Sequence, residues 1–72
     1  MTDLELKILN YVKENGGDLG LLYSYLRERF NHTGNDIGLT HYRLRKNGMI
    51  GHNGDTYYLT PLAIAKLRCG VL

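Results

Sequence analysis

The segment at residues 37–60 constrains the fold more than any other part of this chain. Its first half has apolar residues at helical spacing, and a Lys-Asn-Gly run at 46–48 then ends the helix, because glycine readily adopts the left-handed conformation of a helix C-terminus. Two short apolar segments follow, separated by Asn53-Gly54, a dipeptide typical of two-residue β-turns. The segment therefore predicts a helix followed directly by a β-hairpin over residues 49–59 that turns at Asn53-Gly54.

Two helices are predicted before this segment. Thr2 and Glu5 fit the capping-box pattern at the start of the first helix, and an Asn-Gly-Gly run at 15–17 ends it. Asp18 is suited to cap the second helix, which should end near residues 31–32. Apolar residues at helical spacing form one face of each helix: Leu4, Ile8, Leu9, Tyr11 and Val12 in the first, and Leu19, Leu22, Tyr23, Leu26 and Phe30 in the second.

The third predicted helix spans about residues 36–47, and either Thr33 or Asn35 is placed to cap it. Ile37, His41 and Leu44 form its inward stripe, which leaves Leu39, Tyr42, Arg43 and Lys46 on the outer face. Thr60 and Pro61 mark the start of a last helix, because proline at the first helical position loses no hydrogen bond. The apolar surface of this helix is formed by Leu62, Ala63, Ile64, Ala65 and Leu67.

Charge is distributed unevenly along the chain. Residues 1–39 carry four basic and six acidic side chains, whereas residues 40–72 carry five basic and one acidic side chain. This asymmetry favours a polyanionic partner. The helix macrodipole also favours basic residues near helix C-termini, which explains part of the pattern but not the scarcity of acidic residues after residue 39.

Length and composition predict one domain, residues 1–72. No apolar run reaches the roughly 18 residues of a membrane span, and no N-terminal signal is recognisable, so a cytoplasmic location without membrane contact is expected. Because Cys69 is the only cysteine, no internal disulfide is expected. No metal site is expected either, since His32, His41, His52 and Cys69 show no ligand-pair spacing. The sequence also lacks nucleophile–base arrangements, phosphate-binding glycine loops and paired carboxylates, so no enzyme activity, cofactor or small-molecule substrate is expected.

The chain resembles winged helix-turn-helix transcription regulators of bacteria, archaea and their viruses. Leu44 and the Gly-Met-Ile run at 48–50 are similar to the L-x-x-x-G-L-I/V junction of this family. The Tyr-Leu-Thr-Pro run at 58–61 is similar to its Y-x-L-T-P exit from the wing, here without the intervening residue. The resemblance implies an α+β, mostly helical fold with three helices, a short two-stranded wing and a C-terminal helix. It also implies that helix 36–47 enters the DNA major groove and that hairpin 49–59 lies along the backbone or minor groove.

Arg43 is the leading candidate for a base or phosphate contact, because guanidinium donates two parallel hydrogen bonds to guanine or phosphate. The alternative is a solvated surface arginine. Arg45 and Lys46 are candidates for phosphate contacts. Tyr42 is placed either to contact a sugar or thymine methyl or to pack against the wing. Further DNA-binding candidates are Thr33 and Asn35, whose alternative role is capping, Leu39 on the outer face, and His52 and Asn53 at the wing, whose alternative is an exposed turn. His41 is predicted to be a hydrogen-bonded core histidine.

The sequence thus predicts sequence-specific binding of double-stranded DNA by a transcription regulator. A homodimer would double the contacts on a pseudo-palindromic site, and Leu6, Leu21, Tyr25 and the last helix offer surfaces for it. The alternative is a winged-helix module that binds protein and not DNA, because a fold does not by itself fix a function.

Overall fold

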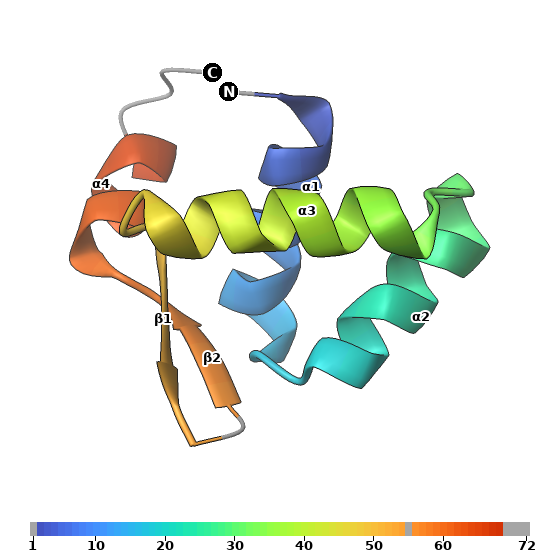
Figure 1. The fold of residues 1–72 in the computed structure, drawn as a ribbon. Helices are drawn as coiled ribbons and strands as arrows, with labels where there is room; N and C mark the ends of the chain where they lie inside the picture. The colour runs from blue at the N-terminus through green and yellow to red at the C-terminus, as the bar shows by residue number, and fades with distance from the viewer. Residues whose placement is uncertain (1, 55, 69–72) are drawn as a thin grey trace.

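The computed structural model describes residues 2–54 and 56–68 of the chain. The elements are α1 (Asp3–Asn15), α2 (Leu19–Phe30), α3 (Gly34–Lys46), β1 (Ile50–Asn53), β2 (Thr56–Leu59) and α4 (Pro61–Arg68). In Figure 1, α3 crosses the front of the molecule with α1 behind it, and the hairpin descends from its C-terminal end. The predicted α+β, mostly helical class is confirmed by the four helices and the antiparallel two-stranded hairpin of the described residues. No helix in the described ranges combines the length and apolar character needed to cross a membrane.

Side-chain caps fix where the helices begin. Thr2 and Glu5 form the predicted capping box, with the Glu5 N–H donating to the Thr2 hydroxyl at 3.2 Å and the Thr2 N–H donating to Glu5 Oε1 at 2.9 Å. Asp18 caps α2. Thr33, and not Asn35, caps α3, since its hydroxyl accepts from the Asp36 N–H at 3.2 Å. This cap explains why α3 begins two residues before the predicted start; it also ends one residue earlier, at Lys46.

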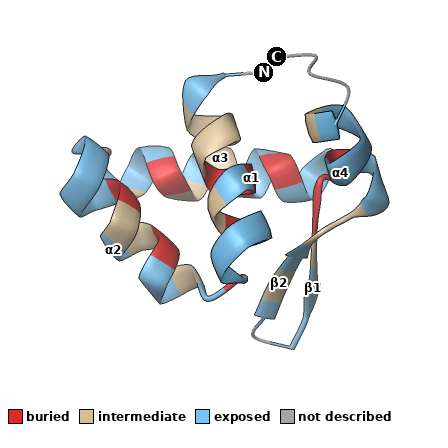
Figure 2. Ribbon diagram, turned by 180° about the vertical axis from the view of Figure 1, so that it is seen from behind, coloured by how far each residue is buried: buried red, intermediate tan, exposed pale blue. Residues whose placement is uncertain are grey.

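The core forms where α3 packs against α1 and α2. The predicted inward stripe of α3 is confirmed, because Ile37, His41 and Leu44 are all buried and Leu44 has an exposed fraction of 0%. Figure 2 shows the buried faces of the three helices turned toward one another. The buried apolar residues that complete this core are Ile8, Leu9, Val12, Leu22, Leu26, Met49, Ile50 and Ala63.

The hairpin turns one residue later than predicted. Asn53 is the last residue of β1 and pairs with Thr56, so it belongs to the strand ladder and not to the connection. Gly54 supplies the positive backbone angle that follows the strand, with φ at 65°. The prediction that Asn53 and Gly54 are the two central residues is therefore wrong. The Asn-Gly pattern located the glycine correctly, but that glycine follows directly after the last strand pair.

A backbone contact fixes the hairpin to the connection between α1 and α2. The Tyr57 N–H donates to the Gly17 carbonyl at 3.3 Å. A Cβ atom at Gly17 would lie 1.7 Å from the Tyr57 carbonyl oxygen, so no other residue fits without separating the two segments. The sequence explained Gly17 only as part of a helix end, whereas its position also depends on this close approach.

Part of the predicted apolar surface remains open. Of the described α4 residues only Ala63 is buried, while Leu62 and Ile64 are exposed at 48% and 41%. Phe30, predicted on the apolar face of α2, is also exposed, because it lies at the end of the helix. The Lys7 ammonium sits 4.1 Å from the centre of its ring. Of the three residues suggested as dimer contacts, Leu21 is exposed, whereas Leu6 and Tyr25 are half-buried.

Candidate nucleic-acid interface

The outer face of α3 carries an exposed stripe of polar, amphipathic and apolar side chains. Asn35, Leu39, Tyr42 and Lys46 are all exposed, and their spacing places them on one line along the helix. Leu39 and Tyr42 keep 53% and 56% of their surface open. These positions face outward because the core takes up the opposite face of α3. At about 1.5 Å per residue, the stripe is roughly 16 Å long.

The two arginines of α3 lie on opposite flanks of this stripe, because two residues correspond to about 200° around a helix. Arg43 is on the flank away from the hairpin. The pKa of Glu5 is held below its usual value mainly by the hydrogen bonds of its carboxylate with Thr2, with a smaller contribution from the positive charge of Arg43. Arg45 faces the hairpin, where its guanidinium carbon lies 5.3 Å from the centre of the Tyr57 ring.

Charge is also separated along the length of α3. Asp36 is in the first turn, and Arg43, Arg45 and Lys46 are in the last turn. This order complements the helix macrodipole, so it contributes to helix stability as well as to any interaction with an anion. The basic end of α3 is the end that leads into β1.

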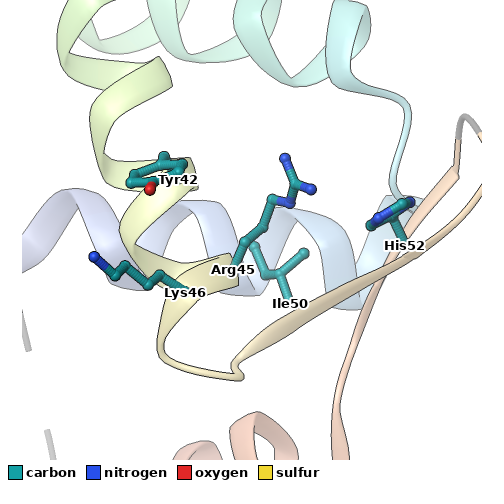
Figure 3. A pocket seen from close by; sticks show the side chains of 5 residues that line it. All are labelled: Tyr42, Arg45, Lys46, Ile50 and His52. Carbon is teal, nitrogen blue, oxygen red and sulfur yellow. The ribbon is translucent and has the colours of Figure 1, made fainter.

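A shallow hollow of about 280 Å³ lies where the basic end of α3 meets β1. Tyr42, Arg45 and Lys46 line it from the helix, and Ile50 and His52 line it from the strand. Figure 3 shows the Arg45 side chain between those of Tyr42 and His52, while Lys46 extends to the other side of the helix. The hollow thus combines two permanent cations, a phenol and an imidazole over an apolar side chain.

Tyr57 connects this hollow to the core. The His41 and Tyr57 rings are perpendicular with centres 4.6 Å apart, and the centre of the His52 ring lies 5.9 Å from that of Tyr57. His41 is buried as predicted, with an exposed fraction of 4%, but its Nε2 atom has no hydrogen-bond partner within the described structure. Burial lowers the pKa of His41, and the charge of Arg45 lowers it further. His41 is therefore a neutral core residue, and the predicted hydrogen bond is absent at Nε2.

The structure brings some of the predicted site residues together and separates others. Tyr42, Arg45, Lys46 and His52 meet at the hollow. Asn53 lies on the opposite face of the hairpin from His52, because successive strand residues point to opposite sides. The remaining candidates lie along α3: Thr33 at its cap, Asn35 and Leu39 in the exposed stripe, and Arg43 on the flank away from the hairpin.

Two residues at this surface were not predicted from the sequence, Ile50 in the hollow and Tyr57 behind it. The strand register contained the signal for Tyr57, since His52 and Tyr57 are direct cross-strand partners. Placing the turn one residue too early hid this pair, because it set His52 opposite residue 55. Comparison with known proteins finds no family model, curated protein or solved structure that matches this chain.

Proposed function

We propose that this chain is a winged helix-turn-helix domain that binds double-stranded DNA and regulates transcription. Helix α3 enters the major groove, and the β1–β2 hairpin serves as the wing beside it. The exposed stripe of α3, with a basic end that meets β1, is the observation that carries the proposal. An α-helix with its side chains is about 10–12 Å across, which fits a major groove about 12 Å wide.

The chemistry of the α3 side chains supports division of this surface into base and phosphate contacts. Arg43 offers two parallel donors to a guanine edge, and Asn35 offers a donor and an acceptor to an adenine edge. Leu39 and Tyr42 present apolar surface suited to a thymine methyl group. Lys46 contacts phosphate, which adds affinity without reading sequence. Two copies of the domain on a pseudo-palindromic site would double these contacts.

A second candidate function is protein binding, and exposed apolar residues of α4 and β2 favour it. Ile64 of α4 and Tyr58 of β2 are 41% and 49% exposed, and both line one hollow between α4, β2 and the end of α1. Large apolar groups exposed together mark interaction surfaces in many proteins. This surface lies outside the α3 stripe, so the two functions are compatible in one molecule.

Binding to duplex DNA of random sequence across a salt series tests the proposal. We expect binding at low salt and a steep loss of affinity as salt rises, because counterions are released when cations meet phosphates. On a duplex selected by the protein, Arg43→Ala should cost about 1–3 kcal/mol and relax preference at one position. Lys46→Ala should weaken all sequences alike. Absence of binding at low salt would overturn the proposal and favour protein binding.

A further inference from the structure

The hollow between α3 and β1 has the size and lining of an anion site. It is shallow and open to solvent, and its volume of about 280 Å³ leaves room for a phosphate group. Arg45, Tyr42 and His52 present hydrogen-bond donors to it, and Lys46, whose side chain extends to the other side of the helix, adds a positive charge nearby. Within the described residues, no carboxylate lines the hollow.

Packing holds two of these groups in a defined place. The Arg45 guanidinium and the His52 imidazole lie 5.3 Å and 5.9 Å from the centre of the same Tyr57 ring. Tyr57 is itself fixed, because its N–H is bound to Gly17 and its ring contacts buried His41. A guanidinium that rests on an aromatic ring loses less conformational freedom when it binds an anion.

The C-terminus of α3 opposes an anion only weakly. The helix macrodipole places about half a negative charge there, against one full positive charge each on Arg45 and Lys46. Several terminal carbonyl groups are also occupied, since the N–H groups of Asn47, Gly48 and Met49 donate to the carbonyls of residues 43–45. The balance at the hollow is therefore positive, and an anion is the favoured ligand.

We propose that this hollow binds one phosphate of the DNA backbone, with Arg45 as its permanent donor and His52 as a donor that binds a proton together with the phosphate. The inference rests on the DNA-binding function proposed above and adds a proton-linked step to it. Among the described residues, the titratable or charged groups that line the hollow with His52 or contact its ring are Arg45, Lys46 and Tyr42 from α3 and Tyr57 from β2. None of these groups is an anion at neutral pH, so the negative charge beside His52 comes from the bound phosphate.

The direction of the pH dependence follows from this arrangement. A phosphate beside His52 stabilises the imidazolium form, so the complex holds a proton that the free protein releases more easily. Affinity should therefore rise as pH falls through the range of about 5–8 in which imidazoles change charge, and fall as pH rises. Buried His41 acts in the opposite direction, because its protonation opposes folding.

Duplex binding measured at constant ionic strength across pH tests the inference. The probe is a random-sequence duplex, and the proteins are wild type, His52→Gln and the control His32→Gln, with circular dichroism recorded at each pH. We expect wild-type affinity to be about tenfold higher near pH 6 than near pH 8, tenfold being the effect of one pKa unit of coupling. His52→Gln should show a flat profile. His32→Gln should keep the wild-type profile, because His32 lies at the end of α2 beside Lys7.

The outcomes separate this inference from the function on which it rests. Duplex binding with a flat wild-type profile, or with the full pH dependence retained in His52→Gln, overturns the phosphate site and leaves DNA binding intact. No duplex binding at low salt overturns the proposed function and this inference with it. Arg45→Gln gives a second measurement. If Arg45 and His52 hold the same phosphate, this variant should bind that phosphate more weakly, and the pH dependence that His52 contributes should therefore also decrease.

Discussion

Helices α3 and α4 were both predicted to have an apolar surface, yet the two helices are buried to different extents. The apolar stripe of α3 is buried against α1 and α2, and its outer face is polar and basic. In α4, Ala63 is buried, whereas Leu62 and Ile64 are exposed. Figure 2 shows the contrast, with buried bands across α3 and a mostly exposed α4.

The difference follows from the neighbours available to each helix. α3 lies in the middle of the chain and packs against α1, α2 and β1. α4 follows the hairpin and packs chiefly against β2, which is only four residues long. An apolar pattern therefore predicts a helix reliably, but burial depends on how many elements surround it.

Truncation of one leucine on each helix should give the largest contrast. Leu44→Ala removes a fully buried side chain and should destabilise the protein by about 2–5 kcal/mol. Leu62→Ala removes a side chain that is 48% exposed and should cost less than about 1 kcal/mol. Urea denaturation measures both. Equal losses would show that α4 contributes to the core as much as α3 does.

The contact between Gly17 and β2 can be tested next. Strand β2 packs against both α4 and α1, so this contact should affect the stability of that side of the molecule. Gly17→Ala places a Cβ atom against the Tyr57 backbone and should cost about 2–3 kcal/mol, since a backbone clash is not relieved by a rotamer change. Gly34→Ala at the start of α3 is the control, because a Cβ atom there would lie at an ordinary contact distance of 3.9 Å from Tyr23 and should not destabilise the protein. Thermal unfolding compares the two variants, and a stable Gly17→Ala protein would contradict the tethering of the hairpin.

A smaller effect is expected in the pH dependence of stability, through His41 on the inner face of α3. The lowered pKa of His41 means that the unfolded chain binds its proton more readily than the folded protein. Stability should therefore be fully present above the ordinary imidazole value of about 6.5 and decline as pH falls below it, by at most about 1.4 kcal/mol per pH unit. His41→Leu should remove this decline in urea denaturation measured across pH. A decline that persists in His41→Leu would assign it to other groups.

Much of the fold was predictable because its signals are local. The capping residues Thr2, Asp18 and Thr60 and the apolar spacing of α3 act within a few positions of one another. The hairpin register was missed by one residue, since a strand pairing depends on both strands and on the turn that joins them. The exposure of α4 was not predictable from its own residues, because it reflects the partners that surround it.

The candidate site was predictable only as separate residues. Periodicity placed Tyr42, Arg43 and Lys46 on the outer face of α3, and all three are exposed. It did not show that Arg45 rests on Tyr57, a contact that joins a helix to a strand more than ten positions away. The same register error separated His52 from Tyr57. The grouping of these residues therefore depends on contacts between elements, which residue spacing within one element does not reveal.

The salt dependence of duplex binding in Lys46→Ala and Lys66→Ala tests whether α3 and the adjacent hairpin form the DNA-binding surface. Both variants remove one exposed lysine, from the outer face of α3 and from α4 respectively. If α3 and the adjacent hairpin hold the DNA, Lys46→Ala should reduce the slope of log affinity against log salt by about one, whereas Lys66→Ala should leave it unchanged. Equal slopes in the two variants, a larger change in Lys66→Ala, or a wild-type protein that binds no duplex at low salt would contradict the account.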